Sequence, residues 1–138
     1  MEYFAAAVGA VIDKLESAGF EVVDAAFEEN FTPHLVGQKD DQLLFVLVHA
    51  VEGPHLSSFS EAAFNAEVLP QVESITTHPK ARAVADLAQK HHGYAELVVV
   101  ALLPTDDEHE DGSPIYFAKV FPSRAIDPWG RLGDATGS

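Results

Sequence analysis

Apolar and polar positions alternate at two different periods along the chain. Within residues 3–18 the apolar positions recur every three or four residues, and Gly19 follows as a common C-terminal signal of helices. The next run, FEVVDAAF at residues 20–27, is rich in residues that favour strands. The pattern therefore predicts a helix that leads directly into a strand. The apolar stripe of the helix consists of Phe4, Val8, Val11, Ile12 and Leu15.

The following segment predicts a hairpin. Leu35 and Val36 form a short strand with the residues before them, and Pro33 marks a strand start or an edge position. A polar turn at residues 37–41 leads into QLLFVLVHA, residues 42–50, which is the most hydrophobic stretch of the first half. This stretch lacks clean alternation, so we expect both of its faces to be buried, as in a central strand.

Helical periodicity returns after this strand. One helix is expected over residues 61–75, with Ser58 or Ser60 suited to cap its N-terminus. A second is expected over residues 79–93, which begin with a proline at a favourable first-turn position. Gly93 is expected to end the second helix.

The last third of the chain predicts two more strands. Residues 95–104, AELVVVALLP, form a second fully apolar strand, and an acidic loop follows at residues 105–114. Residues 115–121 alternate between apolar and polar positions and predict a final strand. Residues 122–138 are rich in glycine and proline, so we expect a partly disordered tail after a single domain at residues 1–121.

The order of elements is α-β-β-β-α-(α)-β-(β). Three consecutive strands joined by short turns form a meander, and a helical crossover then returns the chain to the sheet beside an existing strand. We therefore predict an α/β fold with a mixed sheet of four to five strands flanked by helices.

Composition and charge narrow the function. The 138 residues indicate one domain, and the absence of cysteine excludes disulfides and thiolate chemistry. The N-terminal stretch has neither the basic leader of a signal peptide nor an uninterrupted apolar span, so we expect a cytoplasmic protein with no membrane partner. Twenty-two acidic residues face eight basic ones, giving a net charge of −14, which disfavours nucleic acid as a partner.

Two interpretations of the acidity stay open. It is either a solvated surface that keeps the protein soluble or an adaptation to a salt-rich cytoplasm, in which long-range repulsion is screened. Unfolding on removal of salt would favour the second interpretation.

Residues 34–49, HLVGQKDDQLLFVLVH, resemble a hairpin of small uncharacterised bacterial endonuclease-like proteins related to archaeal Holliday-junction resolvases. That hairpin is close to D-L-I-A-x-D-G-x-x-L-V-F-V-E-V-K. Residues 81–103, ARAVADLAQKHHGYAELVVVALL, resemble the crossover helix and the following strand of the same family. The resemblance implies the restriction-endonuclease-like fold of the PD-(D/E)xK nucleases.

The resemblance also implies that the catalytic groups are replaced. In that family an aspartate and a glutamate bind Mg²⁺, and a lysine stabilises charge on the attacking water or the phosphate. The corresponding positions here are His34, Leu47 and His49, and leucine cannot coordinate a metal. We therefore expect no catalytic residue, cofactor or metal, and a binding cleft around His34, Leu47, His49 and Glu52.

Other site chemistries stay open at this stage. His34 and His49 could together bind zinc, copper or nickel, because these metals accept imidazole. The acidic stretch at residues 105–112 lacks EF-hand spacing, so a solvated loop is expected there rather than a calcium site. Carboxylates that could replace the lost catalytic pair are Asp13, Glu16, Glu21, Asp24 and Glu52.

Three functions follow from these observations. The preferred one is a catalytically inactive nuclease-like domain that acts as a binding or interaction module. The second is a metal-dependent DNA endonuclease that uses relocated carboxylates. The third is a structural or regulatory homodimer, joined through an exposed sheet edge or an apolar surface near Phe59 and Phe64. The sequence identifies no partner.

Overall fold

The structure is a computed structural model that describes residues 2–27, 34–67, 79–127 and 132–135. Residues 61–67 are helical. The other elements are α1 (Glu2–Ser17), β1 (Glu21–Ala25), β2 (Leu35–Lys39), β3 (Gln42–Glu52), the 3-10 helix η1 (Leu56–Ser58), α3 (Pro79–Lys90), β4 (Tyr94–Glu108), β5 (Pro114–Val120), β6 (Arg124–Ile126) and β7 (Leu132–Ala135).

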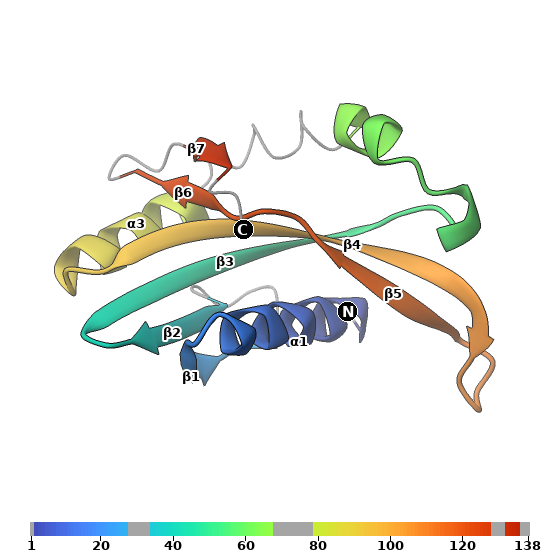
Figure 1. The fold of residues 1–138 in the computed structure, drawn as a ribbon, viewed down its shortest axis with the longest axis horizontal. Helices are drawn as coiled ribbons and strands as arrows, with labels where there is room; N and C mark the ends of the chain where they lie inside the picture. The colour runs from blue at the N-terminus through green and yellow to red at the C-terminus, as the bar shows by residue number, and fades with distance from the viewer. Residues whose placement is uncertain (1, 28–33, 68–78, 128–131, 136–138) are drawn as a thin grey trace.

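The sheet is mixed, and β3 and β4 form its centre (Figure 1). β1, β2 and β3 form an antiparallel meander, and the crossover brings β4 back parallel to β3. β6 and β5 both pair with the other edge of β4, near its start and its end respectively, and β7 pairs with β6. Among the described residues seven strands join this sheet, which confirms the predicted α/β class and adds short C-terminal strands to the expected four or five.

The two faces of the sheet carry separate cores. On the α1 side, Leu44, Val46 and Val48 of β3 pack against the apolar stripe of α1. On the α3 side, Phe45 and Leu47 pack with the small and branched residues of α3. Both faces of β3 are therefore buried, as its unbroken apolar run predicts.

The end of α1 follows a known capping pattern. Gly19 adopts a left-handed φ of 92°, and its N–H donates to the carbonyl oxygen of Glu16 at 3.0 Å. The N–H of Phe20 donates to the carbonyl oxygen of Leu15 at 2.9 Å. This is the Schellman arrangement, in which the residue after the glycine packs back onto the last helical turn. It fixes where Phe20 enters the sheet layer.

The end of α3 differs from the prediction. The helix ends at Lys90, and the left-handed residue is His92, with φ 56°, rather than Gly93. Gly93 is instead required by close packing, because a Cβ atom there would lie 2.6 Å from the carbonyl oxygen of Leu43. The missing side chain allows the chain that enters β4 to pass directly beside β3.

β4 also extends beyond its prediction, through Glu108 and into the expected acidic loop. Its pairing with β3 ends at Leu102, so Pro104 lies where, among the described residues, only β5 pairs with the strand. A proline is tolerated at such an edge position. The acidic residues therefore continue a hairpin instead of beginning a loop.

Two other predictions concern the segments around the crossover and the C-terminus. The hydroxyl oxygen of Ser60 accepts the N–H of Ala63 at 3.4 Å, so Ser60 caps the helical residues 61–67, whereas residues 68–75 lie outside the described residues. β6 and β7 fall in the predicted tail. They join the sheet because Ile126 is buried in the α3-side core and Ala125 pairs with β4.

Candidate functional site

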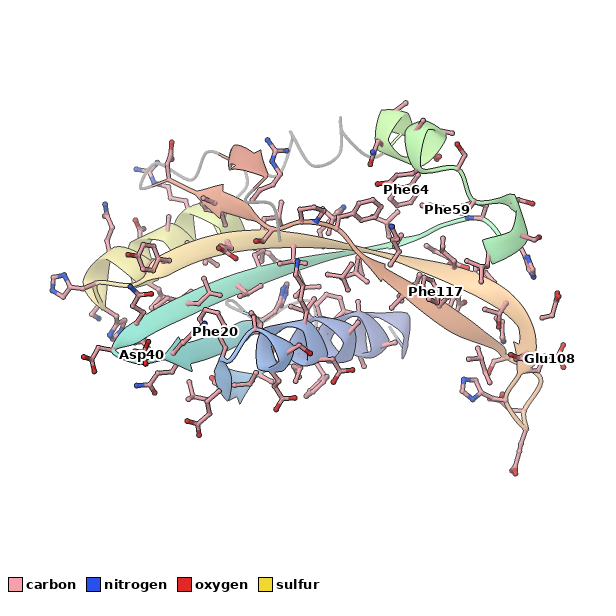
Figure 2. All side chains as sticks on the ribbon, viewed as in Figure 1. Phe20, Asp40, Phe59, Phe64, Glu108 and Phe117 are labelled. Atoms are coloured by element: carbon pink, nitrogen blue, oxygen red, sulfur yellow. The ribbon has the colours of Figure 1, made fainter. Side chains whose placement is uncertain are left out.

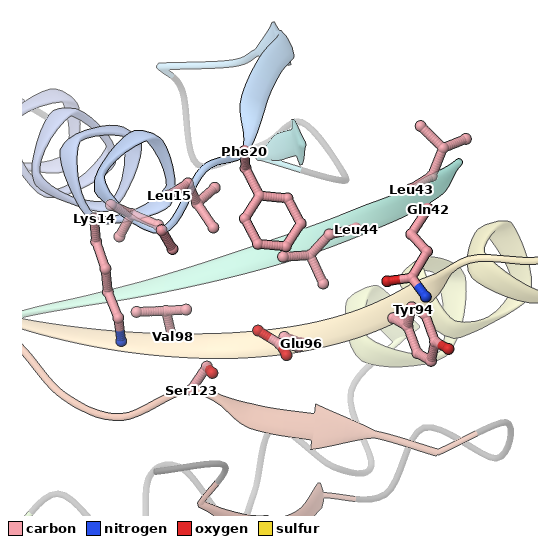
Figure 3. Close-up of a pocket in the computed structure, with 12 residues that line it drawn as sticks. Lys14, Leu15, Phe20, Gln42, Leu43, Leu44, Tyr94, Glu96, Val98 and Ser123 are labelled. Carbon is pink, nitrogen blue, oxygen red and sulfur yellow. The ribbon is translucent and has the colours of Figure 1, made fainter. Parts of the chain in front are cut away.

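A pocket opens on the α1 side of the sheet, at the end where β3 and β4 begin (Figure 3). Its volume is about 280 Å³, near the lower limit for small-molecule sites. The C-terminal half of α1 forms one wall, the strands form the floor, and the segment before β6 borders the other side. The lining residues are Val11, Lys14, Leu15, Ala18, Phe20, Gln42, Leu43, Leu44, Tyr94, Glu96, Val98 and Ser123.

The helical wall follows from the residue spacing of α1. Val11 and Leu15 lie four residues apart on one helical face and are buried, and Lys14 occupies the same side of the helix. The capping turn after α1 brings Phe20 beside Leu15. Figure 3 shows the ring of Phe20 directed toward Leu44 on the floor. The pocket thus begins as an uncovered continuation of the α1-side core.

Lys39 supports the aromatic part of this wall from outside. Its ammonium lies 5.6 Å from the centroid of the Phe20 ring and donates to the carbonyl oxygen of Ala18 at 2.9 Å. A cation at this place is attracted both to the face of the aromatic ring and to the negative, C-terminal end of the helix dipole. Lys39 therefore links the end of α1 to β2 and holds Phe20 in position.

Lys14 and Glu96 bring opposite charges to an otherwise apolar pocket. Both side chains are half-buried, and Figure 3 shows their charged ends directed into the pocket. The Lys14 ammonium donates to the carbonyl oxygen of Phe121 at 3.3 Å. Burial lowers the pKa of Lys14 below its ordinary value of 10.5, and the Glu96 carboxylate partly opposes this by raising it.

Polar groups complete the border of the pocket. Gln42 and Tyr94 are exposed at its mouth, and Ser123 is buried beside the lysine end of the pocket. An apolar floor with one cation, one anion and a few hydrogen-bonding groups is the usual composition of a small-molecule site. The arrangement is suited to a molecule with an apolar body and two oppositely charged ends.

His34 lies away from this pocket. Its Nδ1 accepts the N–H of Val48 at 2.8 Å, and its ring meets Phe4 of α1 edge-on with 4.8 Å between the ring centroids. The side chain is buried in this position. The imidazole therefore takes the place of a backbone acceptor beside β3, just before β2 begins.

The other residues of the predicted cleft lie elsewhere on β3. Leu47 is only 3% exposed and belongs to the α3-side core, and His49 is half-buried two positions further along the same face. Glu52 is exposed at the end of β3, where the Tyr116 hydroxyl donates to its carboxylate at 3.5 Å. The structure brings Leu47 and His49 to one face and His34 against the opposite helix. None of the four lines the pocket.

The carboxylates considered as replacements are dispersed. All five are exposed, and they lie on α1, β1 and the end of β3. Within the described ranges, no three histidine, aspartate or glutamate side chains come close enough to hold a metal ion together. These carboxylates are Asp13, Glu16, Glu21, Asp24 and Glu52.

The apolar surface expected near Phe59 and Phe64 is mostly internal, which corrects that part of the homodimer prediction. Phe64 is buried and stacks on Phe121 with 5.4 Å between the centroids, and Phe59 packs 5.5 Å from Phe64. The reason is that the helical segment 61–67 folds these rings onto the end of the α3-side core.

Comparison with known proteins gives a family without an assigned activity. The family model described as "Domain of unknown function (DUF8840)" matches residues 1–121. No curated protein matches the chain. Across the described residues, no helix is both long and apolar enough to cross a membrane. By the extent of the family match, the chain belongs to the DUF8840 family.

Proposed function

We propose that this protein is a non-hydrolytic binding module on a nuclease-like scaffold, and that the pocket beside α1 holds its ligand. The observation that carries the proposal is that Lys14 and Glu96, of opposite charge, both line one largely apolar pocket of about 280 Å³. The meander followed by a parallel crossover supports the scaffold part. The buried leucine at position 47, where the nuclease resemblance requires a carboxylate, supports the non-hydrolytic part.

The ligand class follows from the charges. A small zwitterion with an apolar side chain, such as an apolar amino acid, places a carboxylate beside Lys14 and an ammonium beside Glu96. Its side chain then covers Phe20, Leu44 and Val98. Because such a molecule is neutral overall, the net charge of −14 does not repel it.

The direct test is calorimetric titration with L-leucine and L-phenylalanine. We expect binding to the wild type that weakens about tenfold or more in Lys14→Met, because a charge-assisted hydrogen bond is lost while the aliphatic stem is kept. Glu96→Gln should weaken binding for the same reason. Lys90→Met, which removes an exposed lysine at the end of α3, is the matched control and should bind as the wild type does.

Blocked amino acids separate the two charges. The methyl ester of leucine lacks the carboxylate, so it should bind the wild type and Lys14→Met equally. N-acetyl-leucine lacks the ammonium and should lose its sensitivity to Glu96→Gln. The proposed ligand would be contradicted if neither L-leucine nor L-phenylalanine binds. It would also be contradicted if Lys14→Met and Glu96→Gln both bind with the affinity of the wild type.

The nuclease alternative is tested on supercoiled and branched DNA with Mg²⁺ and Mn²⁺. We expect no cleavage. Cleavage that disappears in Glu52→Ala or Asp24→Ala would overturn the non-hydrolytic proposal in favour of relocated carboxylates.

A further inference from the structure

A patch of exposed apolar side chains lies at the far end of the sheet, away from the pocket. It consists of Leu56, Ile115 and Phe117, which are 41%, 38% and 48% exposed, and we call it the distal patch. Ile115 and Phe117 are two residues apart on β5 and therefore share a face. Phe117 pairs with Leu103, which is buried in the α3-side core, so the patch continues that core outward (Figure 2).

The segment that carries Leu56 contacts the ribbon formed by the paired strands β4 and β5. His55 Nε2 lies 2.9 Å from a carboxylate oxygen of Asp106 on β4, and His55 Nδ1 lies 2.8 Å from the hydroxyl of Ser57. The hydroxyl of Thr105, also on β4, donates to the carbonyl oxygen of Ile115 on β5 at 2.6 Å. The His55–Asp106 contact thus joins the η1 segment to β4, and the Thr105–Ile115 bond joins β4 to β5.

The surroundings of the distal patch are acidic. Lys119 is on the same face of β5, but its ammonium lies 4.0 Å from a carboxylate oxygen of Glu61 and 5.9 Å from the centroid of the Phe121 ring. The exposed carboxylates of this end of the molecule form what we call the acidic rim: Glu61, Asp106, Asp107, Glu108, Glu110 and Asp111.

We propose that the distal patch binds a basic amphipathic segment of another protein. Apolar residues of that segment would cover Phe117 and Ile115, and its lysines or arginines would meet the acidic rim. Complementary charge favours this partner and accelerates its association. A second copy would bring two acidic rims together, and nucleic acid would present phosphates of the same sign as the rim.

The test uses a fluorescently labelled helical peptide of leucine and lysine only, with the leucines at helical spacing, and a matched peptide in which glutamate replaces lysine. Anisotropy should show binding of the leucine–lysine peptide that weakens as salt rises, because ionic screening reduces the attraction. The leucine–glutamate peptide should not bind. Circular dichroism at each salt concentration verifies that the protein stays folded.

A matched pair of variants locates the site. Phe117→Ser should weaken peptide binding about tenfold, the effect of losing a central apolar contact. Phe27→Ser removes a ring with nearly the same exposure, 49%, which follows β1 on the opposite edge of the sheet, and should leave binding unchanged. Glu108→Gln should weaken binding and reduce its salt dependence.

Several outcomes would overturn the proposal. These are absence of binding by the leucine–lysine peptide, equal binding of the leucine–glutamate peptide, and equal losses in Phe117→Ser and Phe27→Ser. Light scattering adds one more, because a wild-type dimer that Phe117→Ser dissociates would assign the distal patch to a second copy of this chain.

Discussion

The two ends of β4 show how one strand can serve a covered and an uncovered part of the molecule. From Ala95 to Leu103 the strand is buried or half-buried between α1 and α3, whereas from Asp106 to Glu108 it is exposed in the ribbon with β5 (Figures 1 and 2). Lengths explain the difference. The 16 residues of α1 span about 24 Å, and the 15 residues of β4 about 50 Å.

A helix of half the strand's length leaves sheet uncovered. At the start of β4 the uncovered face is enclosed by Phe20 and the segment before β6, which produces the pocket. At its end, on the opposite, α3-side face, no helix of the described residues overlies Phe117, which produces the distal patch. On the α1 side, the mismatch in length between α1 and β4 is therefore the structural origin of the pocket. On the other side, α3 has only 12 residues, about 18 Å, and leaves the end of β4 and its partner β5 uncovered, which is the origin of the distal patch.

The largest effect on the free energy of unfolding is expected when the buried member of one cross-strand pair is truncated, in comparison with its exposed partner. Leu103 and Phe117 pair across β4 and β5, but only Leu103 is fully buried. Leu103→Ala should lower the free energy of unfolding by about 2–5 kcal/mol through loss of buried area and creation of a cavity. Phe117→Ala should cost about 1 kcal/mol or less. Urea unfolding measures both, and equal losses would contradict the difference between covered and uncovered parts.

Two glycines, one before β4 and one after it, sharpen the comparison. Gly93→Ala places a methyl group against the carbonyl oxygen of Leu43 and should destabilise by about 1–3 kcal/mol through overpacking. Gly112 has φ 86° and open space around it, so Gly112→Ala should cost only backbone strain, about 1 kcal/mol. Thermal or urea unfolding of both variants checks this order, and a larger loss at Gly112 would contradict it.

A pH effect should follow from Lys14 at the pocket. Burial lowers its pKa in the folded state, so between that lowered pKa and 10.5 the unfolded chain binds more protons. The free energy of unfolding should therefore rise with pH across this window, and Lys14→Met should remove that rise. Urea unfolding at a series of pH values tests it, with Lys90→Met as the control; parallel curves for wild type and Lys14→Met would contradict the burial of Lys14.

The smallest effect is expected in the turn at the tip of the ribbon. The pKa of Asp111 is lowered because its carboxylate accepts hydrogen bonds from the Ser113 hydroxyl, at 2.6 Å, and from the Ser113 N–H, at 3.0 Å. The turn should keep these bonds above pH 3.8 and lose them as the pH falls through the lowered pKa. The amide proton shift of Ser113 should report this midpoint. Ser113→Ala should move the Asp111 midpoint back toward 3.8, and an unchanged midpoint would contradict the role of the hydroxyl.

Much of the fold could be predicted because it depends on local signals. The stripe of α1, the capping glycine and the unbroken apolar run of β3 each fix an element by short-range chemistry. The extension of β4 past Pro104 could not be predicted this way, since it depends on where β3 stops pairing. β6 and β7 were missed because a short strand held by Ile126 leaves little pattern in a segment rich in glycine and proline.

The pocket was not predicted, because it depends on the relative lengths of α1 and β4 and on the return of the chain to β4. Two weak signals were present. Lys14 interrupts the core-facing side of α1, and Gly19–Phe20 is the Schellman pattern that packs an aromatic ring onto Leu15. The predicted cleft rested instead on a resemblance around Leu47, which the structure places in the α3-side core.

The most direct test of the central claim is titration of the isotope-labelled protein with L-leucine, followed by amide chemical shifts. The account predicts saturable chemical-shift changes concentrated at residues around the pocket, namely Phe20, Leu44, Val98 and Ser123. In Lys14→Met the same changes should require a higher concentration of leucine. Absence of shifts up to the solubility limit of leucine, or shifts concentrated in β5 instead, would contradict the assignment of this pocket as the binding site.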